Sequence, residues 1–208
     1  MTSLSHILNH KIVAIIRGAH PKDILKIVEA LHQGGIRTLE VTINSPKAMQ
    51  VIEEVADVMG DKILVGAGTV LDPETARVAL LAGARFIVSP TTNVNTIQIT
   101  KRYGGISIPG AFTATEILTA FEHGGDIIKV FPASQGPRYF EEISGPLPQI
   151  PLMPTGGVNL DNIKDFLNAG AAAFGLGSSL VDTRAAITDD YLKALTEKAQ
   201  AFVKAIEN

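Results

Sequence analysis

Short apolar segments alternate with amphipathic stretches along the whole chain, and this alternation limits the possible fold more than any other feature. Between the apolar segments, hydrophobic residues such as Ile24, Ile27 and Val28 follow helical spacing. The apolar segments themselves are short and rich in β-branched residues, as strands buried on both faces are. Strands that alternate with helices predict a parallel sheet. The expected strands are Ile12–Arg17, Thr38–Thr42, Ile63–Gly66, Phe86–Ser89, Ile106–Pro109, Ile127–Phe131, Leu152–Pro154 and Ala173–Gly175.

Glycines recur just before strands at intervals of roughly 45 residues, which indicates a coarse internal repeat. Helices are expected to end at Gly34-Gly35, Ala82-Gly83-Ala84, Gly124-Gly125 and Ala169-Gly170, because glycine adopts the left-handed conformation of a helix C-terminus at little cost. Each interval holds two strand–helix units, so eight units predict a (β/α)8 (TIM) barrel. We expect one domain over residues 1–208 with a short N-terminal helix; a doubly wound open sheet is the alternative fold.

Three capping signals mark expected helix starts. Ser45 and Asp72 each precede a proline, and Thr113 with Glu116 matches a capping box.

Composition excludes several classes of function. The chain has 208 residues, of which 46% are hydrophobic and 19% charged, typical of a single core-rich globular domain. A net charge of −3 and the absence of tryptophan give no surface for nucleic acid. The absence of cysteine excludes thiolate chemistry and fits a reducing cytoplasm. No apolar stretch predicts a signal peptide or a membrane span. We therefore expect a cytoplasmic protein that binds neither nucleic acid nor membrane.

Two charged residues interrupt otherwise apolar strands. Lys129 lies within Asp126–Pro132, and Glu40 lies within Thr38–Thr42. Burial favours the neutral amine of a lysine, which is a nucleophile toward carbonyl groups, and a nearby carboxylate can move protons for it. The pair therefore predicts a base and a nucleophile that face one cavity. A core ion pair is the alternative.

Other polar residues follow the strand ends, where barrel active sites lie. Arg17 ends the first strand and Thr69 follows the third, so either could hold a substrate carboxylate. An ion pair of Arg17 with Glu40 and a simple turn at Thr69 are the alternatives.

Glycine-rich loops after the last two strands predict a phosphate site. Gly156 and Gly157 follow the seventh strand, and Gly177 and Ser178 follow the eighth. Barrels bind phosphate at these two loops through backbone N–H groups; two tight turns without a ligand are the alternative. His6 and His10 could share a helix face but lack a third ligand, so we expect no metal site.

Five motifs together resemble the 2-keto-3-deoxy-6-phosphogluconate and 4-hydroxy-2-oxoglutarate (KDPG/KHG) aldolase family over essentially the whole chain. Each motif is weak alone, but the five occur in order at the ends of expected strands. They are Leu39-Glu-Val-Thr42, Gly66-Ala-Gly-Thr-Val70, Ile128-Lys-Val-Phe-Pro-Ala133, Pro154-Thr-Gly-Gly-Val158 and Gly175-Leu-Gly-Ser178.

The resemblance implies a class I aldolase that needs no metal or other cofactor and is commonly a homotrimer. Lys129 would form a Schiff base with pyruvate, and Glu40 would be the general acid and base. Thr69 and Pro90 would line the pyruvate pocket. The residues implied to surround the phosphorylated end are Thr155, Gly156, Gly157, Gly177 and Ser178.

One position departs from the gluconate-type pattern. Asn44 stands where many members carry an arginine that contacts the substrate carboxylate. The segment Ile43-Asn-Ser-Pro46 is similar instead to the galactonate-type branch, whose substrate is the C4 epimer. Carboxylate binding would then depend on Arg17 and backbone amides.

Two other functions remain open. A phosphate-binding isomerase or epimerase would use Glu40 as a base and Lys129 as an electrostatic helper, without an imine. A degenerate barrel that only binds a ligand would keep the glycine turns but needs no lysine–carboxylate pair.

Overall fold

The computed structural model describes residues 3–207, so Met1, Thr2 and Asn208 of the expected domain span lie outside the described residues. The strands are β1 (Ile12–Ile16), β2 (Thr38–Thr42), β3 (Leu64–Gly68), β4 (Phe86–Val88), β5 (Ile106–Ile108), β6 (Gly110–Ala111), β7 (Ile128–Val130), β8 (Leu152–Pro154) and β9 (Phe174–Leu176). The α-helices are α1 (Ser3–His10), α2 (Ile24–Gln33), α3 (Ala48–Met59), α4 (Pro73–Leu81), α5 (Val94–Arg102), α6 (Ala114–Glu122), α7 (Pro137–Ser144), α8 (Ile163–Asn168) and α9 (Asp189–Ile206). Two 3₁₀ turns, η1 (Pro21–Asp23) and η2 (Ala133–Gln135), precede α2 and α7.

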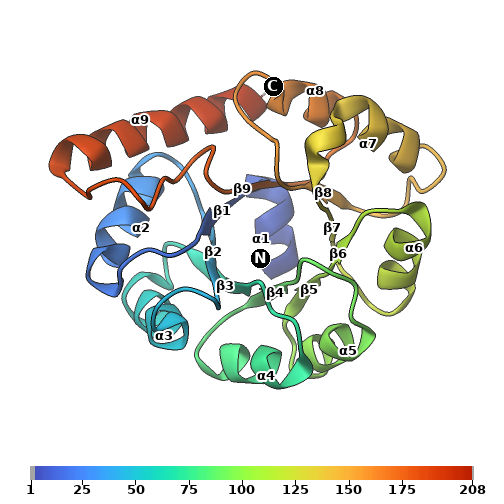
Figure 1. The fold of residues 1–208 in the computed structure, drawn as a ribbon, viewed down its shortest axis with the longest axis horizontal. Helices are drawn as coiled ribbons and strands as arrows, with labels where there is room; N and C mark the ends of the chain where they lie inside the picture. Colours follow the sequence, from blue (N-terminus) through green and yellow to red (C-terminus); the bar gives the residue numbers. More distant parts are fainter. Residues whose placement is uncertain (1–2, 208) are drawn as a thin grey trace.

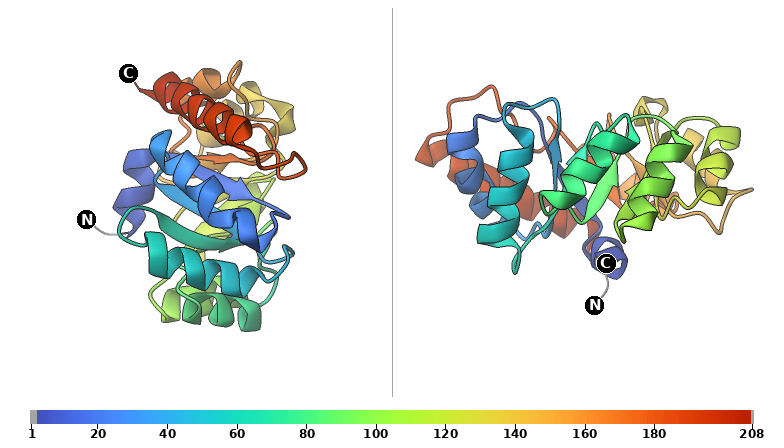
Figure 2. Two further views of the ribbon diagram at one scale, coloured as in Figure 1. Left: turned by 90° about the vertical axis from the view of Figure 1, so that its left-hand side faces the viewer. Right: turned by 90° about the horizontal axis from the view of Figure 1, so that it is seen from below.

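The strands lie at the centre of the molecule and the later helices lie outside them (Figure 1). All strand pairs are parallel, as the alternation predicts. Figures 1 and 2 place α1 apart from this outer layer, across one end of the strands. Loops lie at the opposite end, where the strands finish.

The predicted closed eight-stranded barrel is wrong. Hydrogen bonds divide the strands into a six-stranded sheet in the order β5-β4-β3-β2-β1-β9 and a three-stranded sheet in the order β6-β7-β8. Pro109 stands between β5 and β6, and proline interrupts a strand because it has no N–H to donate. On the other side, a single isolated bridge joins Thr155 to Gly175. The molecule is therefore a curled parallel half-barrel of six strands with a smaller sheet beside it.

Buried apolar side chains form two separate clusters, because alternate residues of a strand point to opposite faces. The larger cluster packs the helices against the outer faces of the strands. The second cluster contains Val13, Phe86 and Met153 from the inner faces, together with Ile7 of α1. Helix α1 thus covers one end of the inner cluster.

Two of the three predicted helix starts are confirmed. Asp72 accepts a hydrogen bond from Thr75 N at 2.6 Å, and Thr113 forms the predicted capping box with Glu116. The third is wrong, because α3 begins at Ala48 instead of next to Ser45.

Glycine ends the helices as predicted. Gly35, Gly83 and Gly170 have φ values of 94°, 100° and 95°. In the third interval it is Gly124, with φ 104°, that adopts the left-handed conformation, and Gly125 follows it.

Within residues 3–207, no helix combines the length and hydropathy that a bilayer span requires. Over the same residues, no three His, Cys, Asp or Glu side chains gather where they could hold a metal ion.

Candidate active site

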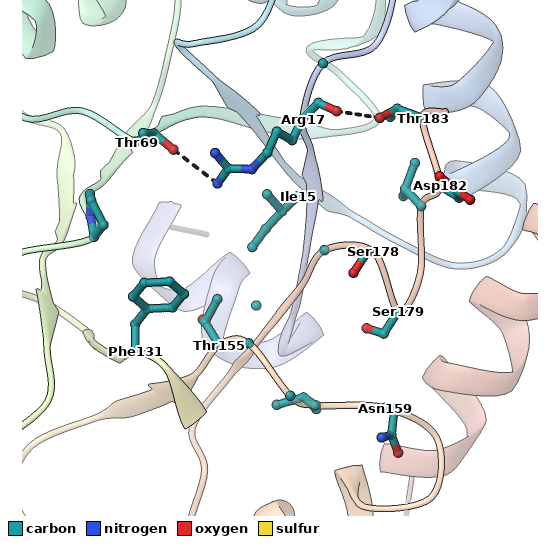
Figure 3. Close-up of a pocket in the computed structure, with 18 of the residues that line it drawn as sticks. Ile15, Arg17, Thr69, Phe131, Thr155, Asn159, Ser178, Ser179, Asp182 and Thr183 are labelled. Atoms are coloured by element: carbon teal, nitrogen blue, oxygen red, sulfur yellow. Dashed lines mark hydrogen bonds between the residues drawn. The ribbon is translucent and has the colours of Figure 1, made fainter. Parts of the chain in front are cut away.

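A cavity of about 890 Å³ opens where the strands end, and residues of both sheets line it (Figure 3). This volume lies in the range of ordinary small-molecule sites. The structure brings nine sequence-predicted residues to this cavity. They are Arg17, Thr69, Pro90, Lys129, Thr155, Gly156, Gly157, Gly177 and Ser178.

Lys129 reaches the cavity from the middle of β7, between Gly110 of β6 and Met153 of β8. The residue is only 4% exposed, and its Nζ lies 5.0 Å from the centre of the Phe131 ring. Burial lowers the pKa of the Lys129 ammonium, the carboxylate of Glu40 opposes this change, and the charge of Arg17 adds to it. A lowered pKa increases the fraction of neutral amine, which is the nucleophilic form.

Glu40 does not line the cavity, although it points to the interior from β2. It is fully buried between Ile15 and Gly66 of the neighbouring strands. Neither of its carboxylate oxygens has a hydrogen-bond partner within residues 3–207. Burial raises the pKa of the Glu40 carboxyl, and the positive charges of Lys129 and Arg17 offset part of this rise.

Among the described residues, Glu40 forms no ion pair with Lys129 or with Arg17, the alternative considered for these charges. None of the salt bridges among the described residues includes Glu40, Lys129 or Arg17. Glu40 therefore stays a buried carboxyl beside a cationic site, free to gain or lose a proton.

Gly68 provides the space that Glu40 occupies. A Cβ atom at Gly68 would overlap the Oε1, Cδ and Cγ atoms of Glu40. The glycine at the end of β3 is therefore what allows the carboxyl group to lie over the neighbouring strand.

Arg17 is held at the rim by two side chains. Its Nη2 donates to Thr69 Oγ1 at 3.3 Å, and its Nη1 donates to Asn44 Oδ1 at 3.4 Å. Figure 3 shows the guanidinium directed toward Thr69. Thr69 has a φ of 59°, a strained conformation for a β-branched residue. The surrounding contacts thus fix a hydroxyl and a guanidinium beside each other.

Ser45 links the loops at this rim instead of capping a helix. Its hydroxyl accepts from Gly18 N at 2.8 Å and lies 2.9 Å from Thr42 Oγ1. The loop that carries Asn44 is thereby tied to the loop that follows Arg17.

The glycine loops lie across the cavity from Thr69. Gly156 and Gly157 have φ values of 79° and 94°, a region that favours glycine. Thr155 is 4% exposed, and its hydroxyl has no partner within the described part of the chain. An unpaired buried hydroxyl that lines a cavity is available to a polar ligand group.

The sequence analysis missed Asp182, Thr183 and Arg184, which also line the cavity. They belong to the segment after β9, and the Thr183 hydroxyl donates to the carbonyl of Arg17 (Figure 3). Their position after the last strand was the only signal, since no glycine motif or apolar pattern marks them.

Comparison with known proteins gives a consistent family. The family model "KDPG and KHG aldolase" matches residues 4–197. The 2-dehydro-3-deoxy-6-phosphogalactonate aldolase of Escherichia coli (strain K12) is 37% identical over 196 residues, which are 93% of each chain. The 2-dehydro-3-deoxy-phosphogluconate aldolase of Pseudomonas aeruginosa is 36% identical over 159 residues, 76% of this chain and 72% of that one.

A solved structure agrees with the fold and the sequence match. The KDPG aldolase of Legionella pneumophila, with pyruvate captured as a covalent carbinolamine intermediate, has a TM-score of 0.88 and 31% identity, covering 96% of this chain and 98% of that one. The family match, the curated relatives and this likeness together show that the chain belongs to the KDPG/KHG aldolase family.

Proposed function

We propose that the protein is a class I aldolase that cleaves a 2-keto-3-deoxy-6-phospho sugar acid to pyruvate and glyceraldehyde 3-phosphate. The substrate is the gluconate- or the galactonate-type epimer, and 4-hydroxy-2-oxoglutarate is a further candidate. The observation that carries the proposal is the buried amine of Lys129 at the cavity wall, with a pKa lowered by burial.

The reaction begins when the neutral Lys129 Nζ attacks C2 of the keto acid. Loss of water gives a protonated imine, which accepts electrons. Glu40, acting directly or through a water, takes the proton of the C4 hydroxyl. The C3–C4 bond then breaks and the aldehyde leaves. The electron pair of the broken bond stays with C3 and forms an enamine with the imine carbon. Glu40 returns a proton to C3, and hydrolysis of the imine releases pyruvate.

The position of Glu40 supports proton transfer through a water. Its carboxyl group is fully buried and does not line the cavity, so a bridging water would carry the proton between the carboxyl and the substrate. Its raised pKa favours a group that both takes and returns a proton.

Binding groups are proposed at both ends of the substrate. Arg17 and Thr69, with Pro90 beside them, would hold the pyruvate carboxylate. Backbone N–H groups of the two glycine loops and the Ser178 hydroxyl would bind the phosphate. The unpaired Thr155 hydroxyl, next to the first glycine loop, would donate to or accept from the phosphorylated end.

A sugar-phosphate isomerase or epimerase that uses Glu40 as its base is the alternative. The buried amine of Lys129 at the cavity wall favours the aldolase, because an imine needs a neutral lysine there and an isomerase does not.

The test is product analysis with each epimer of the phosphorylated keto acid. We expect pyruvate and glyceraldehyde 3-phosphate in equal amounts, in the presence of EDTA, and none with Lys129→Ala. Conversion of one epimer into the other without pyruvate would establish an isomerase or epimerase instead. The ratio of the two rates assigns the preferred epimer.

The proposal includes self-association as a homotrimer and the cytoplasmic location expected from the sequence. A related solved structure, 37% identical with a TM-score of 0.88, is a porous cage designed by fusing symmetric oligomeric domains. Large apolar side chains are exposed on this chain at Val78, Leu81 and Tyr103. Light scattering after gel filtration measures the subunit number, and a monomer would refute this part of the proposal.

A further inference from the structure

A third cationic side chain, Arg184, lines the mouth of the cavity. It belongs to the segment between β9 and α9, beyond Ser178 and Ser179, and its side chain is 87% exposed. In Figure 3, Ser178, Ser179 and Asp182 of this segment lie on the side of the cavity away from Thr69.

The segment that carries Arg184 is anchored on both sides. The Thr183 hydroxyl donates to the carbonyl of Arg17, and the Tyr191 hydroxyl donates to the carbonyl of Asp182 at 3.0 Å. Arg184 N and Nε both donate to Asp182 Oδ1 at 3.1 Å. These bonds fix where the side chain leaves the backbone.

The guanidinium of Arg184 keeps its donor edge open. Asp182 occupies Nε, whereas the two terminal nitrogens have no hydrogen-bond partner within residues 3–207. Two parallel N–H donors on one edge match two oxygens of a phosphate, a geometry that lysine or a backbone amide does not offer.

The other cations among the described lining residues serve other parts of the site. The guanidinium of Arg17 is bound to Thr69 and Asn44. Lys129 is buried, and as the nucleophile it must lose its charge. Arg184 is therefore, among the described lining residues, the cation left to meet an anionic group in the cavity that it shares with Ser178.

We propose that Arg184 determines the preference for phosphorylated substrates, by donating its two terminal nitrogens to the phosphate while Asp182 holds its Nε. This inference rests on the proposed aldolase function and adds to it a specificity residue outside the glycine loops.

The experiment compares cleavage of a 2-keto-3-deoxy sugar acid with and without its 6-phosphate, using the full-length protein and following pyruvate release. For Arg184→Gln we expect kcat/KM to fall about tenfold or more for the phosphorylated substrate, mainly through KM, because a charge-assisted bidentate contact is lost. For the substrate without phosphate, kcat/KM of this variant should stay within about twofold of the wild-type value. Arg184→Lys keeps the positive charge but loses the pair of parallel donors, so its kcat/KM for the phosphorylated substrate should lie between those of the wild type and Arg184→Gln.

Arg138→Gln is the matched control. Arg138 is also an exposed arginine whose Nε donates to a carboxylate, Glu142, at 3.1 Å, but it lies on α7 and does not line the cavity. We expect this variant to cleave both substrates as the wild type does. Competitive inhibition by inorganic phosphate should weaken about tenfold in Arg184→Gln and not in Arg138→Gln.

Equal losses on both substrates, or no loss on either, would overturn the role of Arg184 while leaving the aldolase function in place. Failure of the wild type to release pyruvate from either substrate would instead overturn the proposed function, and the specificity role with it.

Discussion

At the scale of single residues, the site depends on two opposite charges that are buried without forming an ion pair. Glu40 has no hydrogen-bond partner within the described residues, and Lys129 lines a cavity that it shares with Arg17. A close ion pair would keep the amine charged and the carboxylate deprotonated. In the proposed reaction, their separation leaves the amine available for attack and the carboxyl group available for proton transfer.

Glu40→Gln should separate the two roles. The amide keeps the shape of the side chain but cannot take a proton, so we expect kcat for cleavage to fall about a hundredfold to ten-thousandfold, the usual contribution of general acid–base catalysis. Imine formation with pyruvate should persist, because Lys129 is unchanged. Steady-state rates and borohydride trapping of the variant measure the two effects, and unchanged kcat would exclude Glu40 as the proton-transfer group.

The raised pKa of Glu40 also predicts a pH-dependent stability. Between the ordinary glutamate pKa of 4.5 and the higher pKa of the folded state, the folded protein binds more of the proton than the unfolded chain does. The stability that Glu40 contributes is complete below pH 4.5 and is lost as pH rises through the folded-state pKa. The amide introduced by Glu40→Gln does not titrate, so the unfolding free energy of this variant relative to wild type should increase with pH over this window. Denaturant titrations at a series of pH values measure it; a constant difference would refute the assigned burial effect.

Sequence reasoning located Lys129, Arg17 and Thr69 because strand ends meet at one edge of a parallel sheet. It could not place Glu40 behind the cavity wall, since that depends on the space above Gly68, a tertiary contact. It also missed Arg184, whose position is fixed by hydrogen bonds from distant residues such as Thr183 to Arg17.

At the scale of elements, the end of β3 controls the site from a neighbouring strand. Gly68 leaves the volume that the Glu40 side chain fills. The next residue, Thr69, has a left-handed backbone conformation, and its hydroxyl accepts a hydrogen bond from the Arg17 guanidinium. Two consecutive residues at one strand end therefore position both Glu40, the proposed acid–base group, and Arg17, the proposed carboxylate-binding group.

Gly68→Ala should displace Glu40 and impair catalysis. The added methyl group overlaps the Glu40 carboxyl, so we expect a loss of kcat of about a hundredfold or more and a destabilisation of about 1–3 kcal/mol from overpacking. Gly145→Ala is the control, because its Cβ would make an ordinary contact of 3.5 Å to Glu141 O in a helical conformation. Wild-type activity of Gly68→Ala would show that the position of Glu40 does not matter.

A helix start was predictable where the capping side chain bonds to the first turn of its own helix. It was not predictable where the candidate capping residue bonds to other parts of the chain. Asp72 and Thr113 bond to backbone N–H groups three residues ahead, so local sequence suffices. Ser45 bonds to Gly18 N and Thr42 Oγ1, and the first of these contacts exists only after β1 and β2 are paired.

At the scale of the whole molecule, the alternation of elements correctly predicted parallel α/β organisation. It did not determine whether the strands close into one continuous sheet. Pairing depends on whether facing backbones can exchange hydrogen bonds, and Pro109 and the short strands β6–β9 leave two sheets in place of one. The half-barrel and the smaller sheet together still bring β1, β7, β9 and Thr69, the residue after β3, to one cavity.

Helix α1 should stabilise this architecture from the end opposite the site. Ile7 is fully buried and packs in the inner cluster with Val13 and Phe86, so Ile7→Ala should lower the unfolding free energy by about 2–5 kcal/mol. Val58→Ala, at a side chain that is 59% exposed, should change it by less than about 0.5 kcal/mol. Chemical denaturation compares the two, and equal small effects would mean that α1 is not part of the inner core.

Lys129 is proposed to carry the covalent chemistry, and trapping of an imine with borohydride tests this role. Protein incubated with pyruvate and borohydride should gain one stable adduct, and peptide mapping should place it on Lys129. Lys129→Ala should gain none and should retain no measurable cleavage. An adduct on a different lysine, or full activity with no adduct after reduction, would contradict the account.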